Sequence, residues 1–362
     1  MFKKIAVIGV GLMGGSFCRA VKKSNAKVHV TALDLPEVLE KARQVQFIDS
    51  ARELGDLEDV CQQADLVVIA TPISGVLELL PRIAEFTASE AIVTDVGSLK
   101  TEINQVGAKY FTGPNGHFIG GHPMAGGENP GLESSDPFLF QNALYALSPA
   151  SGVPFHKLEK MAKLVESIGA HGVIVEPETH DQIAATVSHL PQLLAVTLMR
   201  YVAAKNVSNE LYLKMAAGGF RDMTRIASSP FGIWRDICDG NRENIAEEIN
   251  GLIQALQETR EQLVSGDLKF AFQDSARSRL SIPSDTRGFL RPQYDLVVEV
   301  EDKPGVIATI SVALAEAEIN VKDIEVLKVR ENEGGTIRLA FESSRVRDQA
   351  QKLLSQIGFR YR

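Results

Sequence analysis

The chain has 362 residues, 44% of them hydrophobic and 23% charged, which is enough for two or three domains with ordinary cores. A formal net charge of −8 argues against nucleic acid or anionic lipid as a partner, because both require a basic face. Three scattered cysteines without a CxxC pair fit a reducing cytosol and argue against a zinc site. There is no apolar run of about 18 residues for a membrane span. We therefore expect a cytoplasmic protein without a metal.

Short apolar strands alternate with amphipathic helices in the first part of the chain. Strands are predicted at 3–10, 27–34, 64–72 and 91–98, and helices at 13–24, 36–45 and 74–86. Two further strands are predicted at 141–149 and 172–177. This alternation predicts an α/β domain over residues 1–177 with a parallel, doubly wound Rossmann sheet that is covered on both faces.

The strand signals stop near residue 178, and helical spacing takes over at 180–205, 209–229 and 241–267. We expect an all-helical domain over residues 178–283. The last of these helices carries an apolar stripe that either packs on other helices or forms a dimer seam, because a stripe does not reveal its partner. The stripe consists of Ile245, Ile249, Leu252, Ile253, Leu256 and Leu263.

Residues 284–293 are rich in Ser, Arg, Gly and Pro without a period, which predicts a linker. Residues 294–362 follow with a strand, a helix, a hairpin around "ENEGG", a second helix and a short terminal strand, "FRYR". That order is βαββαβ, the ferredoxin-like arrangement. Since the last strand is short, this domain could need a partner to finish its sheet.

A glycine loop follows the first predicted strand directly. Gly9, Gly11 and Gly14 form the pattern G-x-G-x-x-G, and Asp34 ends the second strand 20 residues later. In this context the loop predicts a site for a dinucleotide pyrophosphate, and Asp34 favours NAD over NADP because it would repel a 2′-phosphate. The alternative is a set of turn glycines beside a solvated acid. The predicted cofactor-binding residues are Gly9, Gly11, Leu12, Met13, Gly14, Asp34, Thr71 and Pro72.

His122 lies in the stretch "IGGHPMAGGE", between glycines and a proline. No helical or strand period runs through it, so we expect an irregular segment at the edge of the sheet. Ligands of doubly wound sheets bind at the carboxyl ends of the strands, where "DVGS" places Ser98. His122 and Ser98 are therefore candidates for a rim beside the nicotinamide. The alternative is that His122 only caps a turn.

The helical domain contributes candidate charged residues in "GGFRDMTRIASSPFGIWRDI". Asp222 and Arg225 are three residues apart and should share a helical face. An arginine fork suits a carboxylate substrate, whereas the alternative is an exposed ion-pair face. The same segment carries the only tryptophan, Trp234, and His189 lies on a helix that is kinked or started by a proline.

The ordered motifs "GVGLMGGS", "DVGSLK", "GGHPMAGGE", "SHLPQ" and "GGFRDMTRIASSPFGIWRDI" resemble the prephenate dehydrogenases of tyrosine biosynthesis. The resemblance runs from Met1 to about Pro283. The tail from Tyr294, with "DKPGV", resembles ACT domains, which are small regulatory modules that bind amino acids.

The resemblance implies the oxidative decarboxylation of prephenate to 4-hydroxyphenylpyruvate with transfer of a hydride to NAD⁺. It implies that His122 accepts the proton of the substrate hydroxyl, with Ser98 beside it, and that Arg225 holds a substrate carboxylate. His189 and Trp234 match substrate-pocket residues, and Glu128 and Asp222 match supporting or gating carboxylates. A homodimer through the helical domain is also implied.

An ACT domain on such an enzyme implies feedback inhibition by tyrosine, which requires two states with different tyrosine affinities. The resemblance places the amino acid at the loop before the first ACT helix and near the start of the second strand. The implied regulatory residues are Asp302, Pro304, Gly305, Val306 and Asn320.

Several other functions fit parts of the sequence. Arogenate or cyclohexadienyl dehydrogenases perform the same chemistry on a related substrate. A β-hydroxyacid dehydrogenase would need a catalytic lysine, and Lys214 lacks the expected surroundings; the nucleotide-binding fold of phosphoglycerate dehydrogenase would not begin so early. A non-catalytic sensor of NAD or amino acids needs no base, so the combination of Ser98, His122 and Arg225 favours an enzyme.

Overall fold

The computed structural model describes residues 2–112, 115–127, 129–281, 294–301, 303–330 and 334–361. The chain forms two compact units, Met1–Leu280 and Ser281–Arg362. The predicted linker, 284–293, lies outside the described residues. Among the helices described, none has both the length and the hydropathy that crossing a membrane requires.

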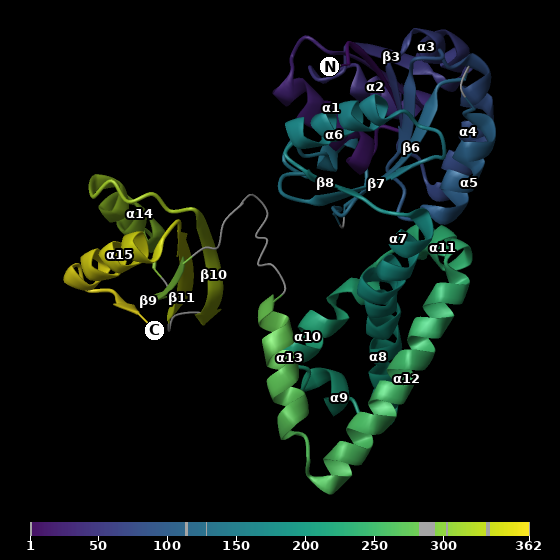
Figure 1. Cartoon of the computed structure of the whole chain (residues 1–362). Helices are drawn as coiled ribbons and strands as arrows, with labels where there is room; N and C mark the ends of the chain where they lie inside the picture. The colour runs from purple at the N-terminus through teal and green to yellow at the C-terminus, as the bar shows by residue number, and fades with distance from the viewer. Residues whose placement is uncertain are drawn as a thin grey trace. The chain divides into compact units, whose positions relative to one another are not determined.

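The larger unit begins with an eight-stranded sheet in the order β3-β2-β1-β4-β5-β6-β7-β8 (Figure 1). The first six strands run parallel, as predicted for the sheet, although β3 and β6 themselves were not predicted. The structure corrects the expectation of a wholly parallel sheet, because β7 runs antiparallel to β6, and β8 is parallel to β7. The reversal follows because no crossover α-helix joins β6 to β7 in the described residues. The strands are β1 Lys4–Ile8, β2 His29–Asp34, β3 Ser50–Glu53, β4 Leu66–Ile69, β5 Ile92–Asp95, β6 His117–Pro123, β7 Leu144–Pro149 and β8 His171–Ile174.

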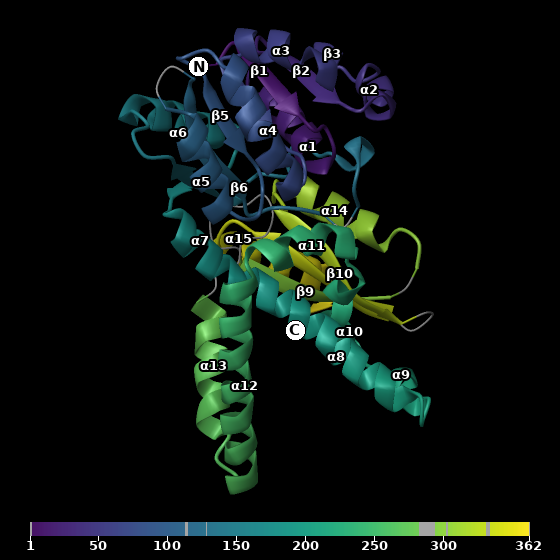
Figure 2. The same ribbon diagram turned by 90° about the vertical axis from the view of Figure 1, so that its right-hand side faces the viewer.

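Helices cover both faces of this sheet, with α1 and α6 on one face and α4 and α5 on the other (Figures 1 and 2). Alternate residues of β1 enter the two cores, because side chains of a strand point to opposite faces: Val7 joins one cluster and Ile8 the other. The helices are α1 Leu12–Ser24, α2 Pro36–Ala42, α3 Leu57–Gln63, α4 Ile73–Phe86, α5 Thr101–Tyr110 and α6 Phe155–Ser167, with short 3₁₀ turns η1 Leu54–Asp56 and η2 Leu132–Ser134.

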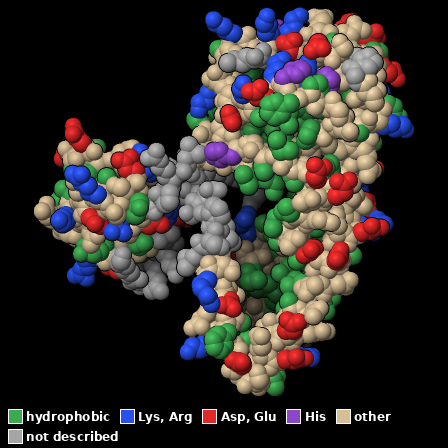
Figure 3. Space-filling view, in the orientation of Figure 1, with side chains coloured by type: hydrophobic (Ala, Val, Ile, Leu, Met, Phe, Trp, Pro, Cys, Tyr) green, Lys and Arg blue, Asp and Glu red, His purple; other side chains and the backbone are tan. Residues whose placement is uncertain are grey.

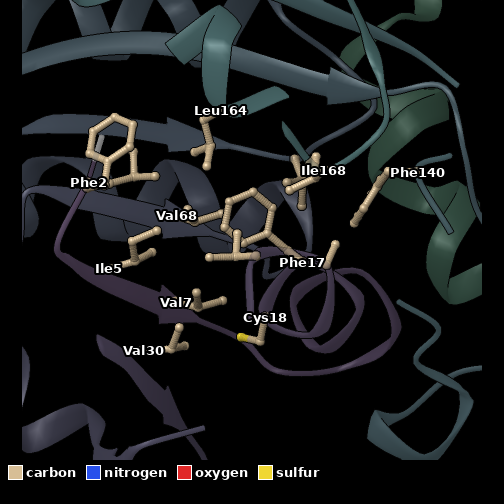
Figure 4. Packing of buried hydrophobic residues seen from close by; sticks show 14 of the residues in the cluster. Phe2, Ile5, Val7, Phe17, Cys18, Val30, Val68, Phe140, Leu164 and Ile168 are labelled. Carbon is tan, nitrogen blue, oxygen red and sulfur yellow. The ribbon is translucent and has the colours of Figure 1, made fainter. Parts of the chain in front are cut away.

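The core beneath α1 anchors the glycine loop. Figure 4 shows Phe17 and Cys18 of α1 beside the strand residues Val7 and Val30, and Leu164 of α6 belongs to the same cluster. All five side chains are buried. Burial of a side chain of this kind stabilises the fold by about 1.5–3 kcal/mol, so the start of α1 is held firmly at the end of β1.

The second region of the larger unit is entirely helical, as predicted. The structure corrects two details: the long helix α12 is followed by α13, and Arg225 begins a separate 3₁₀ turn, so Asp222 and Arg225 do not share one continuous helix. The elements are α7 Pro177–Ala184, the π-helical turn η3 Ala185–His189, α8 Leu190–Asn206, α9 Leu211–Lys214, α10 Gly218–Thr224, η4 Arg225–Ser228, α11 Phe231–Gly240, α12 Arg242–Ser265 and α13 Lys269–Ser281.

The apolar stripe of α12 is only partly covered within one chain. Ile245 at its start is 5% exposed, whereas Ile253, Leu256 and Leu263 are 48%, 56% and 63% exposed. Intrachain packing therefore accounts for the beginning of the stripe and leaves its far end open to a partner.

The smaller unit has the predicted βαββαβ order and the sheet order β10-β11-β9-β12. Leu296, Val298 and Ile310 are among its buried core residues. The predicted terminal strand pairs with β9 through two residues, Arg360 and Tyr361. Its elements are β9 Tyr294–Val300, α14 Val306–Glu316, β10 Asp323–Arg330, β11 Gly334–Phe341, α15 Ser344–Gln356 and β12 Arg360–Tyr361.

Candidate active site

A hollow of about 440 Å³ lies at the carboxyl ends of β1, β2 and β4. Gly9 and Gly11 of the glycine loop, Asp34 at the end of β2, and Thr71 with Pro72 after β4 line it. Asp34 Oδ2 accepts a hydrogen bond from Val10 N at 2.7 Å, which fastens the loop to β2. Helix α1 starts here without a side-chain cap, and the free N–H groups of a helix start suit an anion.

Two observations show that these residues fit a dinucleotide. The hydroxyl of Thr71 is buried beside the hollow and has no hydrogen-bond partner among the described residues, so a ligand there would satisfy it. Gly14 is so close to the loop that a Cβ on it would lie 1.9 Å from Gly9 O. Leu12 and Met13, which open α1, are partly buried and are not among the residues that line the hollow.

Replacing Gly14 with alanine should lower the free energy of unfolding by about 1–3 kcal/mol, because the added methyl group forces α1 away from the loop. The Kd for NAD⁺ should rise more than about tenfold, since the pyrophosphate cradle opens. Thermal unfolding and fluorescence titration with NAD⁺ measure the two effects. Gly55→Ala is the matched control, because its Cβ meets no atom within 4 Å. Wild-type stability and affinity in Gly14→Ala would contradict this account.

His122 is part of strand β6, so the expectation of an irregular segment is wrong. It pairs with Ala146 of β7, three residues after Ile119, where the last pair between β5 and β6 lies. The strand carries glycine where it lies tightly against its neighbour: a Cβ on Gly121 would lie 2.6 Å from Asp95 O. Because glycines have no side chains, they hid the alternation that predicts a strand.

His122 begins a chain of hydrogen bonds into the helical region. Its Nδ1 lies 2.8 Å from His180 Nε2, and His180 Nδ1 lies 2.8 Å from Asp181 Oδ1. An ionised carboxylate only accepts, so His180 donates from Nδ1 and accepts from the Nδ1–H of His122. In this tautomer His122 Nε2 carries a lone pair. The arrangement makes His122 a proton acceptor, oriented by His180 and Asp181.

Burial holds the pKa of His122 well below its ordinary value. The neighbouring His180, Lys100 and His189 lower this pKa further, whereas Asp181 opposes them. Burial also lowers the pKa of His189 to about 4. Both rings are therefore neutral near pH 7, which a proton-accepting imidazole requires.

His189 joins the same group from the helical side and is 2% exposed. Asn241 Nδ2 lies 3.1 Å from His189 Nδ1 and 2.8 Å from the carbonyl oxygen of Asp181. With Asn241 donating to Nδ1, the neutral ring carries its hydrogen on Nε2. The ring of Trp234 lies edge-on to it, with a centroid distance of 6.0 Å. The structure thus unites the predicted residues His122, His189 and Trp234.

The other predicted residues lie around this group. Ser98 is half-buried and follows β5 by three residues. Arg225 is exposed at the start of η4, which Gln192 fastens to α8 by donating to Ile226 O at 2.8 Å. Asp222 is exposed on α10, and Glu128 lies outside the described residues. The structure therefore does not bring Asp222 into the buried histidine group.

Sequence reasoning missed His180, Asp181 and Asn241. The adjacent pair His180–Asp181 opens the helical region, and both side chains are buried. A histidine followed directly by an acid at a predicted domain boundary was the available signal. It was weak, because single residues of these types more often lie at the surface.

The smaller unit has a hollow of about 760 Å³ at the start of α14. Pro304, Gly305 and Val306 of the predicted regulatory set line it, together with residues 357–359 between α15 and β12 and with Arg360 of β12. Asn320 is exposed and is not among the lining residues, and Asp302 lies outside the described residues.

A dinucleotide cradle on a Rossmann sheet, with a neutral, oriented histidine at a neighbouring strand end, defines the class of nicotinamide-dependent dehydrogenases. Residues 17–174 match the model of the prephenate dehydrogenase nucleotide-binding domain, 176–273 that of the prephenate dehydrogenase dimerization domain, and 294–359 that of the ACT domain. The chain belongs to the prephenate dehydrogenase family. The predicted family, fold, enzyme class and NAD cofactor are thereby confirmed.

Individual relatives agree with this assignment. The prephenate dehydrogenase of Bacillus subtilis (strain 168) is 32% identical over 361 residues, covering 97% of this chain and 95% of the relative. The structure of Aquifex aeolicus prephenate dehydrogenase in complex with hydroxyphenyl propionate and NAD⁺ matches with a TM-score of 0.72 at 29% identity, covering 78% of this chain and 99% of that one. Synechocystis arogenate dehydrogenase matches with a TM-score of 0.68 at 27% identity, covering 76% of this chain and 98% of that one.

Proposed function

We propose that the chain catalyses the NAD⁺-dependent oxidative decarboxylation of prephenate to 4-hydroxyphenylpyruvate, in the cytoplasm. The observation that carries the proposal is the hydrogen-bonded series His122–His180–Asp181 in a member of this family. Because His122 Nε2 is left as the acceptor, the ring is prepared to take a proton from a substrate hydroxyl. Family membership favours this enzyme over the non-catalytic sensor.

Each proposed site residue has a separate role in this reaction. When bound, NAD⁺ accepts the hydride from the hydroxyl-bearing carbon of the substrate. His122 takes the hydroxyl proton; His180 keeps its ring oriented, and the Asp181 carboxylate stabilises the resulting imidazolium. As CO₂ leaves and the ring becomes aromatic, the imidazolium returns the proton to the phenol oxygen, so no net proton is released. Ser98 positions the hydroxyl beside His122.

We assign the substrate carboxylates to Arg225 and to the Nε2–H of His189, because both are donors. Trp234 packs beside the substrate ring, and Asp222 and Glu128 support the pocket. Asp34 selects NAD⁺ over NADP⁺ by accepting from the ribose hydroxyls. The cofactor-binding set again includes Leu12, Met13 and Gly14 at the start of α1.

Arogenate is the second candidate substrate. Its support is the structural match to the Synechocystis arogenate dehydrogenase. Arogenate carries an amino group where prephenate carries a keto group, so the same His122 chemistry applies to both. The ratio of kcat/KM for the two substrates decides between them.

We expect purified protein to form NADH from NAD⁺ and prephenate and tyrosine to suppress this rate. Absorbance of NADH at saturating NAD⁺, with prephenate and then arogenate, each with and without tyrosine, measures both effects. A rate that tyrosine leaves unchanged would support the proposed reaction and refute the proposed feedback inhibition by tyrosine. Absence of turnover with either substrate, in protein that binds NAD⁺, would refute the catalytic proposal.

Tyrosine is the proposed effector because it is the end product of the pathway that consumes 4-hydroxyphenylpyruvate. The hollow at the start of α14 supports an amino-acid site in the ACT unit, since the N–H groups of a helix start suit a carboxylate. Pro304, Gly305 and Val306 are the described residues of the proposed site. Asp302 and Asn320 complete the proposed set.

We propose a homodimer through the helical region. Its matched model is a dimerization domain, and Figure 3 shows hydrophobic side chains gathered over these helices. Leu256 and Leu263 on α12, with Phe270 and Phe272 on α13, are 56% to 73% exposed in one chain. Apolar surface of this extent is typical of an interface. The molar mass from light scattering, measured as the protein elutes from a size-exclusion column, tests whether the chain forms a dimer.

A further inference from the structure

An ion pair without any exposure lies beneath the histidine group. The Lys100 ammonium donates to Asp95 Oδ2, and both side chains are 0% exposed. Removing two charges from water costs free energy that their attraction often fails to offset. A buried pair of this kind is therefore weak as a stabilising device, and its surroundings indicate what else it does.

Asp95 holds the two backbone segments that carry the catalytic candidates. Its Oδ2 accepts from Gly97 N at 2.8 Å, and its Oδ1 accepts from Gly121 N at 3.0 Å. These two residues directly precede Ser98 and His122. One carboxylate, fixed by the Lys100 ammonium, thus sets the relative positions of Ser98 and His122.

The backbone beside Lys100 holds the other end of the histidine chain. Lys100 N donates to Asp181 Oδ1 and Thr101 N to Asp181 Oδ2, each at 2.8 Å. Asp181 in turn orients His180. The segment from Asp95 to Thr101 is therefore linked to His122 in two ways. Asp95 binds the backbone N–H of Gly121, which precedes His122, and the backbone N–H groups of Lys100 and Thr101 bind Asp181, which orients His180.

The charges that face His122 come from β5 with the connection after it, from α7 and from η3. Asp95 ends β5 and pairs with Lys100 in that connection, α7 contributes His180 and Asp181, and η3 contributes His189. A cation in this group disfavours a second positive charge on the His122 ring. Burial disfavours it as well.

We propose that Asp95 and Lys100 are positioning residues that hold Ser98 and His122 in register and keep the His122 ring in its neutral, proton-accepting form. This inference rests on the proposed function of His122. Neither residue touches the reacting atoms in this account, since both side chains are fully enclosed. Their substitution should therefore change the protonation of His122 and kcat more than the KM values.

The test follows the His122 ring by NMR in the full chain labelled at histidine Cε1, with His122→Asn used to assign the signal. In Lys100→Met the titration midpoint of His122 should move to higher pH, because a neighbouring cation is gone. The acidic limb of kcat against pH should move in the same direction, and kcat on its plateau should fall at least about tenfold with KM for prephenate within about threefold. A midpoint equal to that of the wild type would overturn the proposal.

Lys157→Met is the matched control, because Lys157 is a buried lysine on α6 that pairs with Glu90 and is not among the groups that act on the pKa of His122. It should leave the His122 titration unchanged, and an equal shift there would also overturn the proposal. If Lys100→Met does not fold, the Asp95→Asn/Lys100→Met double variant removes both buried charges. Its His122 midpoint should also move to higher pH, by less than in Lys100→Met because the Asp95 anion is lost with the cation.

The NMR titration requires no substrate, so it separates the two proposals. A shifted His122 signal in protein that does not oxidise prephenate would support the positioning inference and refute the proposed function. An unshifted His122 signal in a protein that oxidises prephenate would support the proposed function and refute the positioning inference.

Discussion

Replacing His122 with asparagine will lower kcat by about 10²- to 10⁴-fold, the usual contribution of a general base. Asparagine keeps a hydrogen-bonding group at the end of β6 but cannot take a proton. The Kd for NAD⁺ should stay within about twofold, because the hollow of the cofactor is built from β1, β2 and β4. Steady-state rates with prephenate and titration with NAD⁺ measure the two quantities.

His117→Asn is the matched control for this variant, since His117 lies at the opposite end of the same strand and pairs with Ile92 of β5. It should keep nearly the full kcat. A His122→Asn variant with nearly full kcat would remove His122 from the mechanism.

The pH dependence of the wild type follows from the same ring. Burial lowers the pKa of His122 in the folded protein, so the neutral form persists to more acidic pH than in free histidine. Since only the neutral ring accepts a proton, kcat/KM should be lost as the pH falls through this lowered pKa. We expect a flat profile through the ordinary histidine range of about 6.5 and a decrease below it. A decrease centred on the ordinary value would contradict the buried environment.

Replacing Arg225 with leucine will raise KM for prephenate about 10- to 100-fold, because a charge-assisted hydrogen bond to a substrate carboxylate is lost. Arg225→Lys should restore only part of this loss, since an ammonium lacks the planar fork. The Kd for NAD⁺ should not change. Steady-state kinetics with prephenate as the varied substrate give the measurement.

Arg221→Leu is the matched control, because Arg221 is an exposed arginine on α10, four residues before Arg225. Its KM should remain near that of the wild type. An unchanged KM in Arg225→Leu would assign the substrate carboxylate to another residue.

The periodicity of the chain was sufficient to predict the architecture. Continuous apolar strands between amphipathic helices specified the Rossmann sheet, because a strand buried on both faces requires apolar residues at every position. The βαββαβ order of the smaller unit was equally readable. Strands without a clear alternation of apolar and polar residues could not be predicted in this way. Strand β3, Ser50–Glu53, is short and polar, and β6 is rich in glycine.

The sequence also determined much of the site, since the spacing of Gly9, Gly11 and Gly14 from Asp34 is a local property of one strand–loop–helix unit. His122, His189 and Trp234 were likewise found, by motif. The strand that carries His122 was not predicted, because its glycines interrupt the alternation of apolar and polar side chains. Glycine is needed at position 121 because Asp95 of the neighbouring strand approaches too closely for a side chain.

Only the tertiary structure decided how His122, the proposed base, is oriented and kept neutral. His122 and His180 are 58 residues apart in the chain, and Lys100 N and Asp181 are 81 apart. No period or local spacing relates such residues, and each alone is of a type that more often lies in solvent. Their pairing, and the burial that keeps the imidazole neutral, arise when the helical region closes over the ends of β5 and β6.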